Sequence, residues 1–112
     1  MITILPTYTF DGGAFTLCED GKEVSKCVYK ASPGKGEITD LFFETDCKFN
    51  LIDAVTRAVL NSLDKRGVTT VTCANEKIFA ELEKVGFTVE NGIAAINTTQ
   101  FFAQPCKGHN EV

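Results

Sequence analysis

The hydrophobic pattern of this 112-residue chain changes period once, near residue 44. Four β-rich runs come before that point, at residues 2–10, 14–19, 22–31 and 37–43. Apolar and polar side chains alternate along these runs, and short turns separate them, so they predict an antiparallel meander. Leu51, Val55, Val59 and Leu63 then recur at the spacing of one helix face, which predicts an amphipathic helix. The change of period favours a mixed α+β fold built on one layered sheet.

Turn and cap residues set the expected boundaries of these elements. Asp20-Gly21 and Asn91-Gly92 are pairs that tolerate positive φ, so each predicts a tight hairpin. Asn50 is the expected N-cap of the amphipathic helix, and Gly67 is its expected C-terminal stop.

The second half of the chain is predicted to continue as strand, helix, hairpin and one last helical turn. The strand covers 68–74, the helix 75–86 and the hairpin 87–97. Thr98 is the expected cap of the last turn, which Pro105 ends. We expect a single domain over residues 1–112, in which 105–112 form a flexible tail.

Composition and charge argue against several classes of partner. The chain has 11 basic and 15 acidic residues, a net charge of −4 and a pI near 4.9. Nucleic acids and anionic membranes require clustered Lys and Arg, whereas the basic residues here are scattered, so we expect neither partner. No apolar run reaches about 18 residues, and no signal-peptide pattern is present. We therefore expect a cytoplasmic protein, in which the sequon at Asn97 is a chance match.

The cysteines do not suggest a metal site or a disulfide framework. They are odd in number and widely spaced, without a CxxC pair: Cys18, Cys27, Cys47, Cys73 and Cys106. We therefore expect no metal. Cys47 precedes a predicted helix and adjoins Lys48, surroundings that lower the pKa of a thiol. Cys106 and His109 lie in the expected tail, which cannot hold a nucleophile and its base in place.

The segment from Ile38 to Phe87 resembles the Gcn5-related N-acetyltransferase (GNAT) superfamily. ITDLFFET is similar to the family's fourth strand, and NEKIFAELEKVGF is similar to its N…A…Y…GF segment. Asn75, Gly86 and Phe87 stand at the family's positions with its spacing. The resemblance implies a GNAT-like order, β-β-β-β-α-β-α-β-β.

Two helices that follow the first strand in this family have no room in this chain. Only Asp11–Gly13 separate the first two predicted strands. In the family, that helix pair helps to form the wall that contacts the acceptor substrate. The resemblance therefore implies that any acceptor recognition here is rebuilt.

The glycine loop of the family is also altered. In the family, an R/Q-x-x-G-x-G/A turn presents backbone N–H groups to the diphosphate of acetyl-CoA at a helix N-terminus. The equivalent residues here are CKFNLID, with Lys48 at the basic position. In one register Leu51 and Asp53 replace the two glycines; in the other, Asn50 and Ile52 replace them. Side-chain bulk would hold a phosphate away from the amides, and Asp53, expected in the first turn, adds unfavourable charge.

The resemblance nevertheless implies candidate contacts for an acetyl-CoA ligand held between splayed central strands. They are Phe43, Lys48, Asn50, Leu51 and Asn75. Three acids on the fourth strand, Glu37, Asp40 and Glu44, are the candidate general bases. Asp40 is expected to share a strand face with Ile38 and Phe42, where apolar neighbours make a carboxylate a stronger base. The family's acid, a Tyr four residues before the GF glycine, is replaced by Leu82.

Three functions follow, and the sequence leaves all three open. The first is a divergent acetyltransferase-like domain with weak or no acetyl transfer and at most residual binding of a CoA-type ligand. The second is an active acetyl-CoA-dependent N-acetyltransferase acting on a small amine or a protein amine. The third is a non-catalytic interaction or regulatory module that associates with itself or with a partner through an exposed strand edge or an apolar patch.

Overall fold

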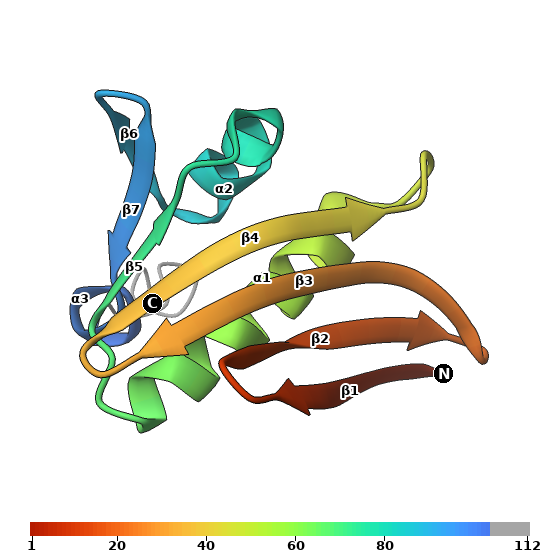
Figure 1. Cartoon of the computed structure of the whole chain (residues 1–112). Coiled ribbons are helices and arrows are strands. Elements are labelled where there is room, and N and C mark those ends of the chain that lie inside the picture. The colour runs from red at the N-terminus through yellow and green to blue at the C-terminus, as the bar shows by residue number, and fades with distance from the viewer. Residues whose placement is uncertain (104–112) are drawn as a thin grey trace, which may run out of the picture.

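A seven-stranded sheet with helices packed against one face forms the body of the protein (Figure 1). The computed structural model describes residues 1–103; the expected tail, with Pro105, Cys106 and His109, lies outside them. In chain order the elements are β1 Ile2–Thr9, β2 Gly12–Glu19, β3 Lys22–Ser32, β4 Lys35–Phe43, α1 Phe49–Lys65, β5 Thr70–Cys73, a 3₁₀ turn at Glu76–Ile78, α2 Phe79–Val85, β6 Thr88–Glu90, β7 Ile93–Asn97 and α3 Thr98–Ala103.

The strands lie in the order β1-β2-β3-β4-β5-β7-β6. All neighbouring strands are antiparallel except β4 and β5, which are parallel. Helix α1 connects these two, as a parallel pair requires. The predicted order of four strands, helix, strand, helix and hairpin is confirmed.

One apolar core lies between the sheet and the helices. Val55, Val59, Leu60 and Leu63 of α1 are fully buried. They pack in one cluster with residues from both halves of the sheet: Leu17, Cys27, Tyr29, Ile38, Val71, Ala94 and Ile96. Leu82 of α2 belongs to the same cluster, so the apolar stripes of both helices are buried against one face.

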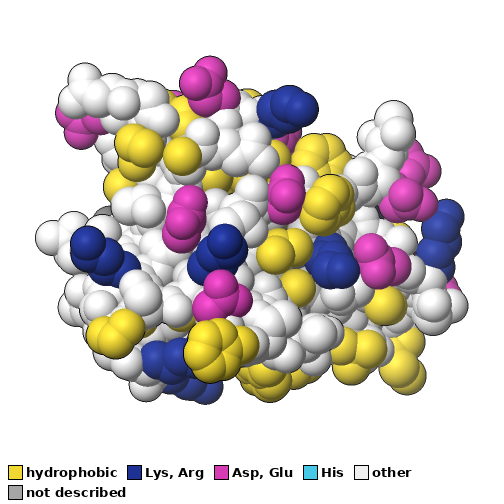
Figure 2. Space-filling view, in the orientation of Figure 1, with side chains coloured by type: hydrophobic (Ala, Val, Ile, Leu, Met, Phe, Trp, Pro, Cys, Tyr) yellow, Lys and Arg dark blue, Asp and Glu magenta, His cyan; other side chains and the backbone are white. Residues whose placement is uncertain are grey.

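The opposite face of β1 to β4 has no helix over it among the described residues (Figure 1). Cross-strand rows on this face mix hydroxyls and charges with a few apolar side chains. One row is Thr9, Gly12, Lys30 and Glu37; the next is Thr7, Ala14, Val28 and Asp40; the third is Leu5, Thr16, Lys26 and Phe42. Figure 2 shows this face, with Lys, Arg, Asp and Glu interspersed among hydrophobic side chains. Such a face is stable in water without a covering layer.

The helix pair expected to be missing is absent. β1 ends at Thr9 and β2 begins at Gly12, with Thr9 and Gly12 paired across the turn. Only Phe10 and Asp11 connect the two strands, so no helix can lie between them.

Helix α1 begins earlier than its expected cap indicates. Asn50 is not the N-cap: Lys48 occupies that position, without a side-chain capping bond, and Phe49 is the first helical residue. Cys47 N–H donates to Glu44 O at 2.9 Å, which turns the chain into the helix before Asn50 is reached. Phe49 packs against the core, and this burial outweighs the lost cap. The predicted stop is confirmed, because Gly67 has φ 82° directly after the helix.

Two other caps differ from the sequence prediction. The predicted helix at 75–86 is a 3₁₀ turn followed by α2, and Asn75 caps the turn by accepting a bond from Lys77 N–H at 3.2 Å. Asn97, not Thr98, caps α3, since its Oδ1 accepts from Gln100 N–H at 2.9 Å. Thr98 is buried instead, and its hydroxyl donates to Asp64 Oδ1 at 2.8 Å.

Candidate functional site

The parallel strands β4 and β5 part after a short paired stretch. They pair only at Lys35–Glu37 with Thr70–Thr72, whereas β4 continues to Phe43. Figure 1 shows the two strands diverging beyond this point. The backbone of β4 from Ile38 onward therefore has no β5 partner on that side, and its polar groups are available to another molecule or to side chains. We call this place the β4–β5 divergence.

A β-bulge reverses the side-chain pattern of β4 at the divergence. Tyr29 faces Ile38 and Val28 faces Asp40, so Thr39 is the extra residue. Ile38 and Leu41 are both buried beneath the helices, which places Asp40 on the helix-free face. The predicted common face of Asp40 and Ile38 is therefore wrong, because a bulge shifts the alternation by one residue; Asp40 does share its face with Phe42.

Asn75 spans the β4–β5 divergence from the end of β5. Its Nδ2 donates to Thr39 O and to Asp40 Oδ1, each at 3.2 Å, while its Oδ1 caps the 3₁₀ turn. All the polar groups of this side chain are thus used within the chain. We call the two contacts with β4 the Asn75 bridge. It holds the strands together where their backbone pairing has ended.

The three candidate bases lie in different surroundings. Glu37 is exposed at the paired end of β4, opposite Thr72. Asp40 is half-buried and accepts the Asn75 bond. Glu44 follows β4 and forms an exposed ion pair with Lys22 at 3.1 Å. Asp40 is thus the candidate base that lies at the divergence and contacts Asn75.

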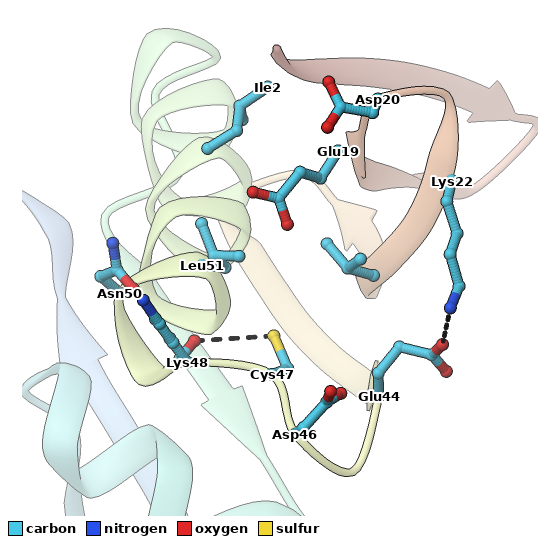
Figure 3. Close-up of a pocket in the computed structure, with 11 residues that line it drawn as sticks. Ile2, Glu19, Asp20, Lys22, Glu44, Asp46, Cys47, Lys48, Asn50 and Leu51 are labelled. Carbon is cyan, nitrogen blue, oxygen red and sulfur yellow. Dashed lines mark hydrogen bonds and ion pairs between the residues drawn. The ribbon is translucent and has the colours of Figure 1, made fainter.

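The loop between β4 and α1 borders a cavity of about 500 Å³ (Figure 3). Lys48, Asn50 and Leu51 line it from the start of α1, as three of the candidate cofactor contacts. Its other walls come from β1, the β2–β3 hairpin and the loop: Ile2, Glu19, Asp20, Lys22, Val24, Glu44, Asp46 and Cys47. No residue of β5 or α2 lines it. The cavity therefore does not continue into the β4–β5 divergence.

The cavity is acidic. Four carboxylates line it, against Lys22 and Lys48. Glu44 pairs with Lys22 and Asp20 with the N-terminal ammonium, whereas Glu19 and Asp46 form no ion pair among the described residues. In Figure 3 the Glu19 carboxylate points toward Leu51, whereas Lys48 extends away from it beside Asn50. A diphosphate entering here would meet several like charges and no glycine. The hairpin carboxylates could not be found from the sequence, because more than twenty positions separate them from the loop and only the meander brings them there.

The pKa of the Cys47 thiol is raised by burial and by the same carboxylates. Burial raises the pKa of its thiol, and the charges of Asp46, Glu19 and Glu44 raise it further. The thiol donates weakly to Lys48 O at 3.5 Å. The prediction of a lowered pKa is wrong, because the nearby carboxylates and burial outweigh Lys48 and the helix N-terminus.

Asp53 and Phe43 both lie outside the first turn of α1. Asp53 is not in the first turn of α1; it lies one turn later and pairs with Arg57 at 2.7 Å, so the positive charge of Arg57 offsets it. Phe43 is partly exposed and borders a small hollow of about 100 Å³ with Val24 and Glu44, apart from Lys48 and Asn50. The structure thus separates the five candidate contacts into three places: the start of α1, the end of β4 and the end of β5.

The position of the family's acid is inside the core. Leu82 has no exposed surface and packs in the common cluster beneath the sheet. It carries no ionisable group, and its burial leaves no surface for contact with a ligand. Among residues 1–103, no three His, Cys, Asp or Glu side chains are grouped as a metal site requires, and no helix has the length and hydrophobicity needed to cross a membrane.

No protein-family model matches this sequence, and no curated protein is recognisably similar to it in sequence. Solved structures are similar in fold. The ribosomal-protein-S18-alanine N-acetyltransferase of Escherichia coli matches with a TM-score of 0.65 and 19% identity, over 81% of this chain and 72% of that chain. The PaiA N-acetyltransferase of Thermoplasma acidophilum in complex with coenzyme A has a TM-score of 0.68 and 16% identity, over 78% and 61%. A GNAT family acetyltransferase of Elizabethkingia anophelis with acetyl-CoA bound has a TM-score of 0.67 and 11% identity, over 86% and 97%.

Proposed function

We propose that this chain, which has the fold of the GNAT acetyltransferases, transfers acetyl groups weakly or not at all and binds a CoA-type ligand at most weakly. The Asn75 bridge is the observation that carries the proposal. A ligand held between β4 and β5 needs the backbone of β4, and the bridge already uses Thr39 O. Such a ligand would first have to break it.

The free energy needed to break the Asn75 bridge lowers the affinity of the chain for such a ligand. Two hydrogen bonds, one of them to a carboxylate, contribute on the order of 1–3 kcal/mol. Since about 1.4 kcal/mol is a factor of ten in affinity, displacing the bridge weakens ligand binding by roughly 5- to 150-fold. The Asp40 carboxylate would also lose its donor.

The start of α1 adds a second obstacle. A diphosphate there needs close approach to backbone N–H groups. Lys48, Phe49, Asn50 and Leu51 all carry side chains at this turn, and Asp46 and Glu44 precede it. These side chains and carboxylates do not fit a CoA diphosphate at the start of α1.

The acid and the acceptor wall are also missing. Leu82 cannot protonate a leaving thiolate, because it has no ionisable group and is buried. No helix lies between β1 and β2, so the helix pair that helps to form the acceptor wall in the family is absent. The missing acid affects protonation of the leaving thiolate, and the missing wall affects binding of the acceptor. Together these two absences favour a protein that keeps the fold without catalysis.

Calorimetry with acetyl-CoA tests the proposal. A ligand stabilises the folded state by RT ln(1 + [L]/Kd), so at about 1 mM acetyl-CoA a Kd above about 10 mM raises stability by less than about 0.1 kcal/mol. We expect the melting temperature to remain unchanged within about 1 °C, and no acetylation of amines above the uncatalysed rate. A rise of several degrees, or acetyl-CoA-dependent turnover, would contradict the proposal.

Two glycine variants test whether side chains at the start of α1 hinder the binding of CoA. Asn50→Gly and Leu51→Gly remove side chains at the start of α1, and we expect each to increase the response to CoA. Asn61→Gly is the matched control, since Asn61 is exposed in the same helix and away from the loop. Equal responses in all three variants would show that side-chain bulk at this turn is not an obstacle.

A further inference from the structure

The outer edge of β1 is unpaired among the described residues. β1 is the first strand in the sheet order, and it pairs only with β2. The pairing is regular over all eight residues, from Ile2 with Glu19 to Thr9 with Gly12. The free edge therefore has no bulge and presents unpaired N–H and C=O groups to solvent.

Exposed edge strands usually carry charges, prolines or bulges that prevent pairing with another strand, and β1 has few of these features. No side chain from Met1 to Phe10 is charged, and the N-terminal ammonium of Met1 pairs with Asp20. No bulge interrupts β1, since the register shift in β2 lies on its pairing with β3. Pro6 is the single residue that discourages further pairing, because it cannot donate a hydrogen bond.

Large apolar side chains are exposed along the same strand. They are Ile2, Ile4, Leu5 and Tyr8, followed by Phe10 in the turn. Ile2, Ile4 and Tyr8 lie on the face that carries α1, and Leu5 lies on the helix-free face. An added strand would thus find apolar neighbours on both faces of β1.

We propose that β1 pairs antiparallel with β1 of a second copy of this chain, joining the two sheets edge to edge. The absence of charge favours a second copy. The chain as a whole carries −4, so copies repel, but two uncharged strands bring no like charges into contact. A two-fold contact of this kind closes on itself and gives a dimer.

Pro6 fixes the register of this pairing. Its nitrogen faces the free edge, because a proline facing β2 would break the β1–β2 ladder. Ile2, Ile4 and Tyr8 share its parity, so their N–H and C=O groups also face outward. Placing Ile2 opposite the partner's Tyr8 retains about six hydrogen bonds. A shift by two residues would set Pro6 opposite the partner's Pro6 and lose more of them.

This register puts Leu5 next to the two-fold axis. Leu5 would face the partner's Leu5 as a non-hydrogen-bonded pair, in which Cα atoms lie about 4.5 Å apart. Leu5 is 52% exposed in the single chain, so the contact would bury apolar surface at its centre. Edge contacts of one strand are small, and we expect reversible association with a Kd of roughly tens to hundreds of micromolar.

Analytical ultracentrifugation of the full chain tests the proposal, over about 1 µM to about 1 mM. We expect the unmodified chain to form a dimer as its concentration rises. Leu5→Lys would set two like charges at the axis and weaken dimerisation by at least about tenfold. Phe42→Lys is the matched control: Phe42 is also 52% exposed on the helix-free face, but on β4 inside the sheet. We expect its dimerisation to match that of the unmodified chain.

A monomer at every concentration would overturn the proposal. So would equal loss of association in the Leu5 and Phe42 variants, or assembly beyond a dimer, which would indicate another surface or another pairing strand. The acetyl-CoA measurement does not depend on this contact, so the two proposals fail separately.

Cross-linking tests the register directly. A Leu5→Cys variant should form a disulfide-linked dimer under mild oxidation, since the two Cα atoms would lie within disulfide range. A Thr9→Cys variant should not exceed the background of the unmodified chain, because the two Thr9 positions would lie at opposite ends of the contact. Equal cross-linking in both variants would exclude the proposed register.

Discussion

Cys47 illustrates how the chemistry of one residue depends on neighbours that are distant in sequence. The adjacent Lys48 and the helix N-terminus both favour a thiolate. Burial, followed by the charges of Asp46, Glu19 and Glu44, raises the pKa of the thiol above its ordinary value instead. A raised pKa lowers the fraction of thiolate near neutral pH and so slows thiolate chemistry at Cys47.

The alkylation rate of Cys47 checks this. Because its pKa is raised, we expect slow reaction with iodoacetamide near neutral pH and a rate that rises steadily with pH as the thiolate forms. Asp46→Asn removes one of the charges and should increase the rate at a given pH by about two- to fivefold. Site-resolved mass spectrometry gives the rate for each cysteine.

Cys27 and an Asp11→Asn variant serve as controls for this measurement. Burial raises the pKa of Cys27 to about 12, so it should not react while the chain is folded. Asp11→Asn removes an exposed charge at the opposite end of β2 and should leave the Cys47 rate unchanged. Fast alkylation at pH 7 would show that the carboxylates do not control this thiol.

At the scale of elements, the connection between β4 and β5 combines backbone pairing with side-chain hydrogen bonds. Three residue pairs join the strands, and the Asn75 bridge continues the connection where the backbone ladder stops. The same side chain caps the 3₁₀ turn that leads into α2. One residue thus links β4, β5 and the start of the second helix.

Removing the bridge should destabilise the chain. Asn75→Ala loses two bonds to β4 and one cap, so we expect a decrease in the free energy of unfolding of about 1–3 kcal/mol. Urea denaturation measures it. Asn61→Ala, at an exposed position of α1, should change stability by less than about 0.5 kcal/mol.

An Asn75→Asp variant isolates the bridge from the cap. It keeps an oxygen that can cap Lys77 N–H but cannot donate, and it sets a second carboxylate beside Asp40. We expect it to be destabilised as well. Stability equal to that of the unmodified chain would mean that the cap, and not the bridge, is what Asn75 contributes.

For the whole molecule, the common core predicts cooperative unfolding. α1 packs against both halves of the sheet: Cys27 and Tyr29 on one side and Val71 and Ile96 on the other belong to one cluster. Neither half can bury its apolar face alone. We therefore expect one domain and a single unfolding transition.

Two probes check this. Tyr29 is buried in the first half of the sheet, and the chain has no Trp, so tyrosine fluorescence reports mainly on that half. Circular dichroism reports on all helices and strands. Denaturation curves from the two methods should coincide; separate midpoints would mean that the meander and the β5–β7 half unfold independently.

Local patterns in the sequence were sufficient for the elements and their order. Asp20-Gly21 and Asn91-Gly92 adopt the positive φ that their hairpins need, and Gly67 ends α1, because such preferences depend on a few adjacent residues. The sequence predicts a later start of α1 than the structure has, because the packing of Phe49 is a tertiary interaction. The bulge at Thr39 was missed for the same reason, since it arises in pairing with β3.

The sequence by itself determined the fold class, the lack of glycine in the loop before α1, the apolar side chain at position 82 and the absence of room for a helix pair after β1. These follow from residue identity and spacing alone. Only the tertiary structure decided that Asn75 bridges β4 and β5, that hairpin carboxylates surround Cys47, and that the edge of β1 is unpaired. Each of these depends on contacts between segments far apart in the chain, and the distances between such segments are set by sheet register and packing.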